Sequence, residues 1–169
     1  MILEQAITQL RWQGQAIIAL TLDVADSEVR WKPNSNNWSM LEVLNHLVDE
    51  EILDFRRHLD HILHTPEGQW PEINPQAWVT EKNYNDTQMN KTLENFKKER
   101  DKSITWLMEL SDPDWDNVVN FSWGSLCAGD MLASWLAHDL LHLRQLIELR
   151  YQITLNACQP FSVEYAGKW

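Results

Sequence analysis

Apolar residues recur at helical spacing over four long stretches of this 169-residue chain, and the alternation typical of strands is nearly absent. The four predicted helices span about residues 2–24, 39–63, 87–110 and 126–151. Four long amphipathic helices joined by loops bury their apolar faces most simply as a four-helix bundle. The pattern therefore predicts an all-α fold with long inter-helix loops and an irregular tail over residues 152–169.

The helix starts carry local signals. Ser39 and Glu42 have the spacing of a capping box, in which the serine oxygen accepts from a free amide of the first turn and the glutamate reaches back. Ser125 is the expected cap of the fourth helix. The connection over residues 65–85 is long for a compact domain, and loops of that length are commonly functional or flexible.

Length, charge and cysteine content narrow the class of protein. The chain fits a single domain over residues 1–169 with a sizeable core. Its formal net charge of −11 argues against a nucleic-acid partner and against anionic membrane surfaces. Two cysteines, Cys127 and Cys158, indicate neither a disulfide framework nor a sulfur-ligated zinc site. The chain shows no signal peptide and no apolar run of roughly 18 residues, so we expect a cytoplasmic protein.

Tryptophan is the unusual residue in the composition, with ten copies. They can line a cleft or close the ends of the bundle, and the sequence leaves both interpretations open. Six lie in or beside predicted loops: Trp31, Trp38, Trp70, Trp78, Trp115 and Trp123.

Histidines on two predicted helices suggest a metal site. His138 and His142 are four residues apart in the fourth helix, so they share one face, and Gln145 is their nearest polar neighbour. Imidazole is costly to bury without a partner, and a bound cation would provide one. His46, in the apolar second helix, offers a third ring. Three neutral nitrogens would leave one coordination position open, which is typical of a reactive centre. The alternative for each ring is a hydrogen-bonded core histidine.

Further polar residues can support this site. Glu50 follows His46 by one turn and is a candidate fourth ligand or outer base. Asp139 and Gln145 are candidates to orient the ligands or to transfer protons, and each can equally be an ordinary polar residue. Zinc, nickel, iron and manganese all accept imidazole. Glu51 falls near the apolar stripe and needs a partner if it is buried.

Three more histidines cluster at the end of the second helix. Cations at that end complement the helix dipole and flank the following loop, so we predict surface positions for all three. They are His58, His61 and His64.

Two motifs together resemble the DinB-like superfamily of metalloenzymes, also called the DinB/YfiT group. They are WSMLEVLNHLVDE at 38–50 and WLAHDLLHLRQ at 135–145, and the turns Asp112-Pro-Asp-Trp115 and Ser122-Trp-Gly124 before the last helix also fit. The resemblance extends from the first helix to about Tyr151.

That resemblance implies a four-helix bundle, commonly a homodimer, with a divalent metal held by three histidines. Carried onto this chain, the ligands are His46, His138 and His142. It also implies transferase or isomerase chemistry that uses a low-molecular-weight thiol.

The leading hypothesis is a metal-dependent enzyme that activates a thiol or water for attack on a small-molecule electrophile. S-transfer is preferred over hydrolysis only by analogy with the family. Zinc and nickel are the first candidates for the ion, followed by iron and manganese. The alternative is a non-catalytic dimeric stress-response or binding module with a structural metal or none. An open coordination position facing a cleft favours catalysis, and a fourth protein ligand favours the alternative.

Overall fold

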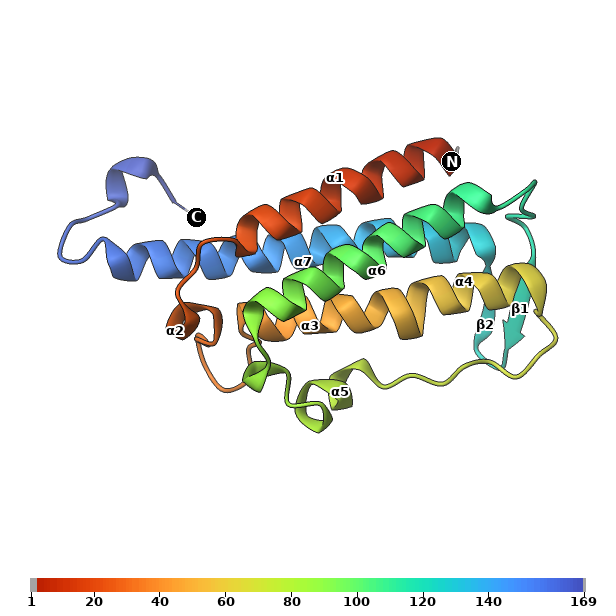
Figure 1. The fold of residues 1–169 in the computed structure, drawn as a ribbon, viewed down its shortest axis with the longest axis horizontal. Helices are drawn as coiled ribbons and strands as arrows, with labels where there is room; N and C mark the ends of the chain where they lie inside the picture. The colour runs from red at the N-terminus through yellow and green to blue at the C-terminus, as the bar shows by residue number, and fades with distance from the viewer. Residues whose placement is uncertain (1–2, 169) are drawn as a thin grey trace.

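The computed structural model describes residues 3–168. Four helical rods dominate this part of the chain and lie side by side along its long axis (Figure 1). The fold is the mostly helical bundle that the periodicity predicts, with one small hairpin. In chain order, the elements are α1 (Leu3–Thr21), α2 (Asp26–Val29), α3 (Met40–Asp49), η1 (Glu50–Asp54), α4 (Phe55–His64), α5 (Pro75–Glu81), η2 (Tyr84–Asp86), α6 (Met89–Glu109), β1 (Val118–Phe121), β2 (Gly124–Cys127), α7 (Ala128–Ala157) and η3 (Glu164–Ala166).

The rods are α1, the continuous α3–η1–α4, α6 and α7. Helix α1 packs against α6 and α7, while α3 packs against α6 and α4 packs against α7. The interior holds two clusters of buried apolar side chains, one including Leu10, Phe55 and Trp135 and the other including Ile17, Leu44 and Phe96. None of the helices within residues 3–168 is long and apolar enough to cross a membrane.

A buried ion cluster lies between the two apolar clusters. The Arg100 guanidinium donates to both oxygens of Asp139 at 2.6 and 2.9 Å, to Glu51 at 2.8 Å and to the Leu10 carbonyl at 2.9 Å. The Trp135 indole N–H also donates to Glu51. Arg100 is therefore the partner that a buried Glu51 requires, and its hydrogen bonds join all four rods.

The second rod changes its winding at Glu50–Asp54, which form a π-helix. In an unbroken α-helix, side chains four residues apart drift by about 40° per step, which would put His46 and His58 about 120° apart. A π-turn takes in an extra residue and counteracts this drift. As a result His46, off the stripe expected for this helix, and Phe55 both face the interior.

The last helix differs from its predicted limits. It begins at Ala128 and continues to Ala157, so the first part of the expected irregular tail is helical. Its N-cap is Cys127, whose Sγ accepts from the Asp130 amide at 3.3 Å, and the prediction of Ser125 as the cap is wrong. Ser125 instead pairs with Asn120 in the antiparallel β1–β2 hairpin. Strands of four residues are too short to give a clear alternating signal.

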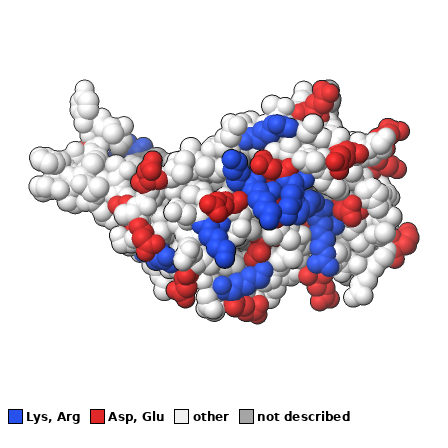
Figure 2. All heavy atoms as spheres, in the orientation of Figure 1, with Lys and Arg blue, Asp and Glu red and all other residues white. Residues whose placement is uncertain are grey.

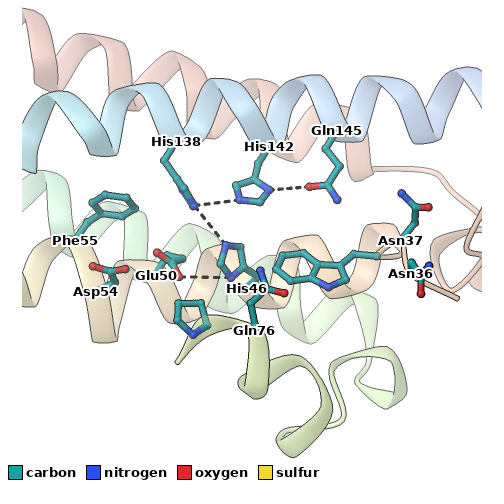
Figure 3. A pocket seen from close by; sticks show the side chains of 12 residues that line it. Asn36, Asn37, His46, Glu50, Asp54, Phe55, Gln76, His138, His142 and Gln145 are labelled. Atoms are coloured by element: carbon teal, nitrogen blue, oxygen red, sulfur yellow. Dashed lines mark hydrogen bonds and ion pairs between the residues drawn. The ribbon is translucent and has the colours of Figure 1, made fainter. Parts of the chain in front are cut away.

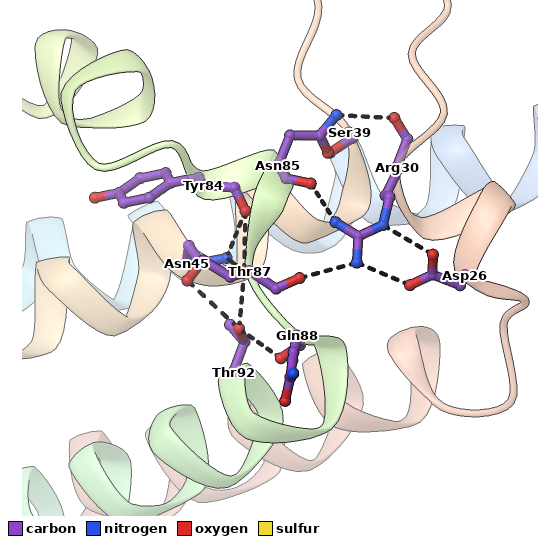
Figure 4. Close-up of polar contacts among 9 residues, drawn as sticks. All are labelled: Asp26, Arg30, Ser39, Asn45, Tyr84, Asn85, Thr87, Gln88 and Thr92. Carbon is purple, nitrogen blue, oxygen red and sulfur yellow. Dashed lines mark hydrogen bonds and ion pairs between the residues drawn. The ribbon is translucent and has the colours of Figure 1, made fainter.

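The long connection after α4 is largely ordered by α5, η2 and polar anchors. Arg30 donates to the Asp26 carboxylate and to the backbone carbonyls of Asn85 and Thr87 (Figure 4). The Asn85 side chain in turn accepts from Ser39 at 2.6 Å, at the start of α3. These contacts tie the connection to the segment before α3, and both contribute to the cavity described below.

Most of the surface drawn in Figure 2 carries no charged side chain, and the charged ones lie in patches. Lysines and arginines gather near the middle of this face, over α6, and acidic side chains lie among and around them. The face shown therefore has mixed charge, unlike the unbroken basic surface that a polyanion requires.

Candidate metal centre

Three histidines from two rods converge as predicted from the sequence. His46 projects from α3 toward His138 and His142 of α7 (Figure 3). The Nε2 atom of His138 lies 3.1 Å from Nε2 of His142 and 3.4 Å from Nε2 of His46. One ligand atom from each ring lies within 4.8 Å of the others. In tetrahedral zinc sites, bonds of about 2.0–2.1 Å place two nitrogens about 3.3 Å apart, so both short distances suit one ion.

The protonation of these rings also suits a cation. Burial, together with the neighbouring histidines, lowers the pKa of His46 to about 2, and burial and His142 lower that of His138 to about 3. Burial lowers the pKa of His142 as well. The rings are therefore neutral at neutral pH, which is the form that binds metal.

Hydrogen bonding shows which nitrogen of His142 faces the centre. The Gln145 amide oxygen lies 2.9 Å from Nδ1 of His142 and accepts its hydrogen, which leaves the lone pair on Nε2. If His138 Nε2 carries a hydrogen, it can donate that hydrogen to only one of the two neighbouring Nε2 atoms, so hydrogen bonding alone does not satisfy all three nitrogens. Nδ1 of His138 and Nδ1 of His46 are buried, and neither has a hydrogen-bond partner among residues 3–168. The donor set therefore fits a divalent cation at the meeting point of the Nε2 atoms.

Glu50 lies beside His46, at the Nδ1 edge of the ring (Figure 3). Its Oε1 is 3.5 Å from Nδ1 of His46. Within residues 3–168, the side chains that can hold an ion together are the three histidines, and Glu50 is not among them. Burial, with the neighbouring Asp54 carboxyl, raises the pKa of Glu50 to about 9. This position fits an outer proton-exchanging group better than a fourth ligand.

Asp139 lies elsewhere. Both of its oxygens accept from Arg100 in the bundle interior, and it does not line the cavity beside the histidines. The structure thus places Asp139 in a buried ion pair, which is the ordinary polar role that the sequence leaves open for it. On α7 it is one residue from His138, which turns the two side chains toward different neighbours.

The histidines lie at an open cavity of about 520 Å³ that several segments line. Sequence reasoning missed four of its polar lining residues: Asn36, Asn37, Asp54 and Gln76. Asn36 and Asn37 precede α3, and Gln76 is in α5, so the 65–85 connection supplies part of the wall. Trp38 also lines the cavity, which bears out the cleft interpretation for this tryptophan. The length of that connection is the sequence signal for Gln76, and nothing in the sequence points to the other three.

Two of the three histidines predicted at the surface are buried. His58 is 1% exposed and His61 is 9% exposed, whereas His64 is exposed. The ring of His58 stacks on Trp70 at 4.2 Å, and Trp70 meets His61 edge-on. The helix-dipole argument failed because the chain folds back after α4 and covers this face.

The pKa shifts predict how stability depends on pH in the metal-free protein. His46 and His138 have folded-state pKa values below their unfolded values, so their stabilisation is lost as pH falls below about 6.5. Glu50 has a raised pKa, so its stabilisation is lost as pH rises from about 4.5 toward 9. Each group changes the free energy of unfolding by up to about 1.4 kcal/mol per pH unit. We therefore expect a stability maximum near pH 6.5, with a net loss of about 1–2 kcal/mol at pH 5.

Urea denaturation across this pH range is the measurement, with Glu50→Gln as the comparison. In the variant, the free energy of unfolding should no longer decline above pH 6.5, and below pH 6.5 it should fall about twice as steeply with falling pH as in wild type. Equal pH profiles for the two proteins would contradict the assignment of Glu50 as a buried, protonated carboxyl.

The fold and the site define a four-helix-bundle protein with a candidate three-histidine metal centre. A model of the DinB superfamily matches residues 9–146, and the chain belongs to this superfamily. The resemblance inferred from the two motifs is thus confirmed. A search among curated proteins gave no significant match.

Several solved structures share the fold, and two of them illustrate it. One is YfiT from Bacillus subtilis, described as a probable metal-dependent hydrolase with an unusual four-helix bundle topology. It superimposes with a TM-score of 0.78 and 15% identity, and the match covers 90% of the present chain and 87% of YfiT. A variant of a mycothiol-dependent maleylpyruvate isomerase superimposes with a TM-score of 0.68 and 17% identity. This match covers 86% of the present chain and 61% of the isomerase. At such low identities the similarity concerns the fold alone.

Proposed function

We propose that this protein is a divalent-metal-dependent enzyme that activates a small nucleophile, in the first place water, for attack on a small-molecule electrophile. The observation that carries the proposal is the convergence of three neutral imidazoles at the wall of a cavity of about 520 Å³, with a buried carboxyl group beside them. A brace between two helices would need neither the cavity nor the carboxyl group.

Each residue has a distinct part in this proposal. His46, His138 and His142 would hold the ion, which when bound would lower the pKa of a coordinated water or thiol and polarise a substrate oxygen. Gln145 keeps the His142 lone pair directed at the centre. Glu50 would accept the proton of the attacking water in its ionised form, whose share grows as pH rises toward the raised pKa of about 9, and would return a proton in its protonated form.

Hydrolysis has stronger physical support here than S-transfer. A thiol on a divalent metal is deprotonated outright and needs no base, whereas attack by water is assisted by a base, which the ionised form of the Glu50 carboxyl group can provide. The fold similarity to a probable metal-dependent hydrolase agrees with this preference.

S-transfer is the second candidate, supported by the fold similarity to a thiol-dependent isomerase. Neither Cys127 nor Cys158 lines the cavity, so the thiol would be a separate low-molecular-weight co-substrate.

The ion, the compartment and the assembly belong to the same proposal. Zinc and nickel are the first candidates and iron and manganese the next, because all four accept imidazole nitrogen. A cytoplasmic homodimer is the assembly that we propose. The exposed side chains Leu140, Leu141 and Ile147 of α7 offer apolar surface for it.

Replacing Glu50 by glutamine tests the choice of nucleophile. Glutamine keeps the size of the side chain but exchanges no proton, so the zinc-loaded variant should retain its metal and hydrolyse p-nitrophenyl acetate about 100-fold more slowly. Asp49→Asn is the matched control, because Asp49 is adjacent but faces Lys82 and Tyr84. Unchanged hydrolysis in the Glu50 variant, with thiol-dependent transfer intact, would shift the assignment to S-transfer.

A further inference from the structure

Four polar side chains follow one another along the second rod at intervals of four residues. They are His46, Glu50, Asp54 and His58. The π-turn at Glu50–Asp54 lies in the middle of this series and keeps it on one side of the rod. The series begins at a candidate metal ligand and ends at a buried histidine that the proposed function does not use.

His58 is held on three sides. Its Nε2 lies 2.7 Å from the Pro71 carbonyl oxygen, which only accepts, so this nitrogen is the donor. Its Nδ1 lies 2.6 Å from Oδ1 of Asp54, within the range of charge-assisted hydrogen bonds. Trp70 stacks on the ring with an interplanar angle of 3°. The ring therefore has one orientation, and its Nδ1 edge fixes one oxygen of Asp54.

Asp54 connects this histidine to the cavity. Its side chain is 14% exposed, lines the cavity and lies beside the carboxyl group of Glu50 (Figure 3). Both carboxyl groups line the cavity, and they are neighbours in its wall. The position of Asp54 therefore bears directly on Glu50.

We propose that His58 is a positioning residue of the candidate metal centre: it fixes the Asp54 carboxyl group at the cavity wall and thereby sets the orientation of Glu50. This inference rests on the proposed function for its catalytic meaning. His58 touches neither the candidate ligands nor the cavity, so it acts only through Asp54.

Two substitutions separate the contacts of His58. In His58→Asn the amide nitrogen takes the place of Nδ1, which keeps a donor to Asp54 and loses the reach to Pro71. In His58→Gln the amide nitrogen takes the place of Nε2, which keeps the donor to Pro71 and loses the one to Asp54. His61→Gln is the matched control. His61 is buried on the same helix and also contacts Trp70, but its Nδ1 faces the Thr65 hydroxyl.

The proteins are compared by crystal structures of the metal-free forms, by zinc content, and by kcat and KM for p-nitrophenyl acetate after zinc loading. We expect Asp54 to stay in place in His58→Asn, with kcat within about threefold of wild type. In His58→Gln we expect Asp54 to turn away from Glu50 and kcat to fall about tenfold, with KM and zinc content unchanged. The His61 variant should match wild type.

Other outcomes would overturn the proposal. If Asp54 keeps its position in His58→Gln, the proposal that His58 fixes Asp54 is wrong. If kcat falls equally in all three variants, His58 contributes only packing. If wild type binds no zinc or shows no turnover, the proposed function fails, yet the crystal structures still decide whether His58 positions Asp54. Should the variants not fold, proton NMR of wild type decides: a strongly deshielded hydrogen between His58 and Asp54 is expected, and its absence contradicts the proposal.

Discussion

Replacing His138 by alanine is expected to remove bound metal and turnover together. His138 is the central ligand of the candidate centre, because its Nε2 lies within 3.4 Å of both other rings. Loss of an outer partner of a metal ligand typically costs 10–100-fold in affinity, so loss of a ligand should cost at least about 100-fold. Elemental analysis of tag-free protein, with the hydrolysis of p-nitrophenyl acetate, measures both effects.

The control for this substitution is His64→Ala. His64 is an exposed histidine near the end of α4, and its replacement should leave metal content and turnover at the wild-type level. Unfolding curves of both variants show whether the fold is preserved. Full metal occupancy in the His138 variant would count against the assignment of the centre.

The largest effect on stability is expected for Arg100→Met. Arg100 is 3% exposed and satisfies two buried carboxylates, so its loss leaves Glu51 and Asp139 without their positive partner in the interior. Breaking a buried ion cluster from one side typically costs about 3–5 kcal/mol. The free energy of unfolding, measured by urea denaturation, should fall by that amount.

The stability prediction has two matched controls. Arg57→Met makes the same chemical change at an exposed position of the same protein and should change stability by less than about 0.5 kcal/mol. Adding Glu51→Gln and Asp139→Asn to the Arg100 variant removes the unpaired charges and should restore part of the loss. A loss below about 1 kcal/mol for Arg100→Met alone would contradict the account of this cluster.

The apolar periodicity was sufficient to predict the four rods and their bundle, because a helix of this length shows its buried face several times over. The periodicity fails to predict the buried face where the helical winding changes. The π-turn at Glu50–Asp54 shifts the buried face within one helix, and no residue type in that segment signals it. The sequence therefore placed His46 off the main stripe, although the three-histidine cluster itself was predicted.

Tertiary context decided the rest of the site. Asp139 is adjacent to His138 in the sequence, but its carboxylate accepts hydrogen bonds from the buried Arg100 of another rod. Asp54 and Gln76 reach the cavity only because the π-turn and the returning connection bring them there. The burial of His58 could not be predicted, because the segment that covers it, which includes Trp70, has no periodic pattern that would indicate where this segment runs.

The most direct test of the central claim is a crystal structure of tag-free protein, with anomalous diffraction data collected at the absorption edge of the metal found by elemental analysis. One divalent ion is expected, bonded to the Nε2 atoms of His46, His138 and His142 at about 2.0–2.1 Å, with an open position toward the cavity. Rings that stay free of metal while the ion lies elsewhere, or a fourth protein ligand that closes the site, would contradict the account.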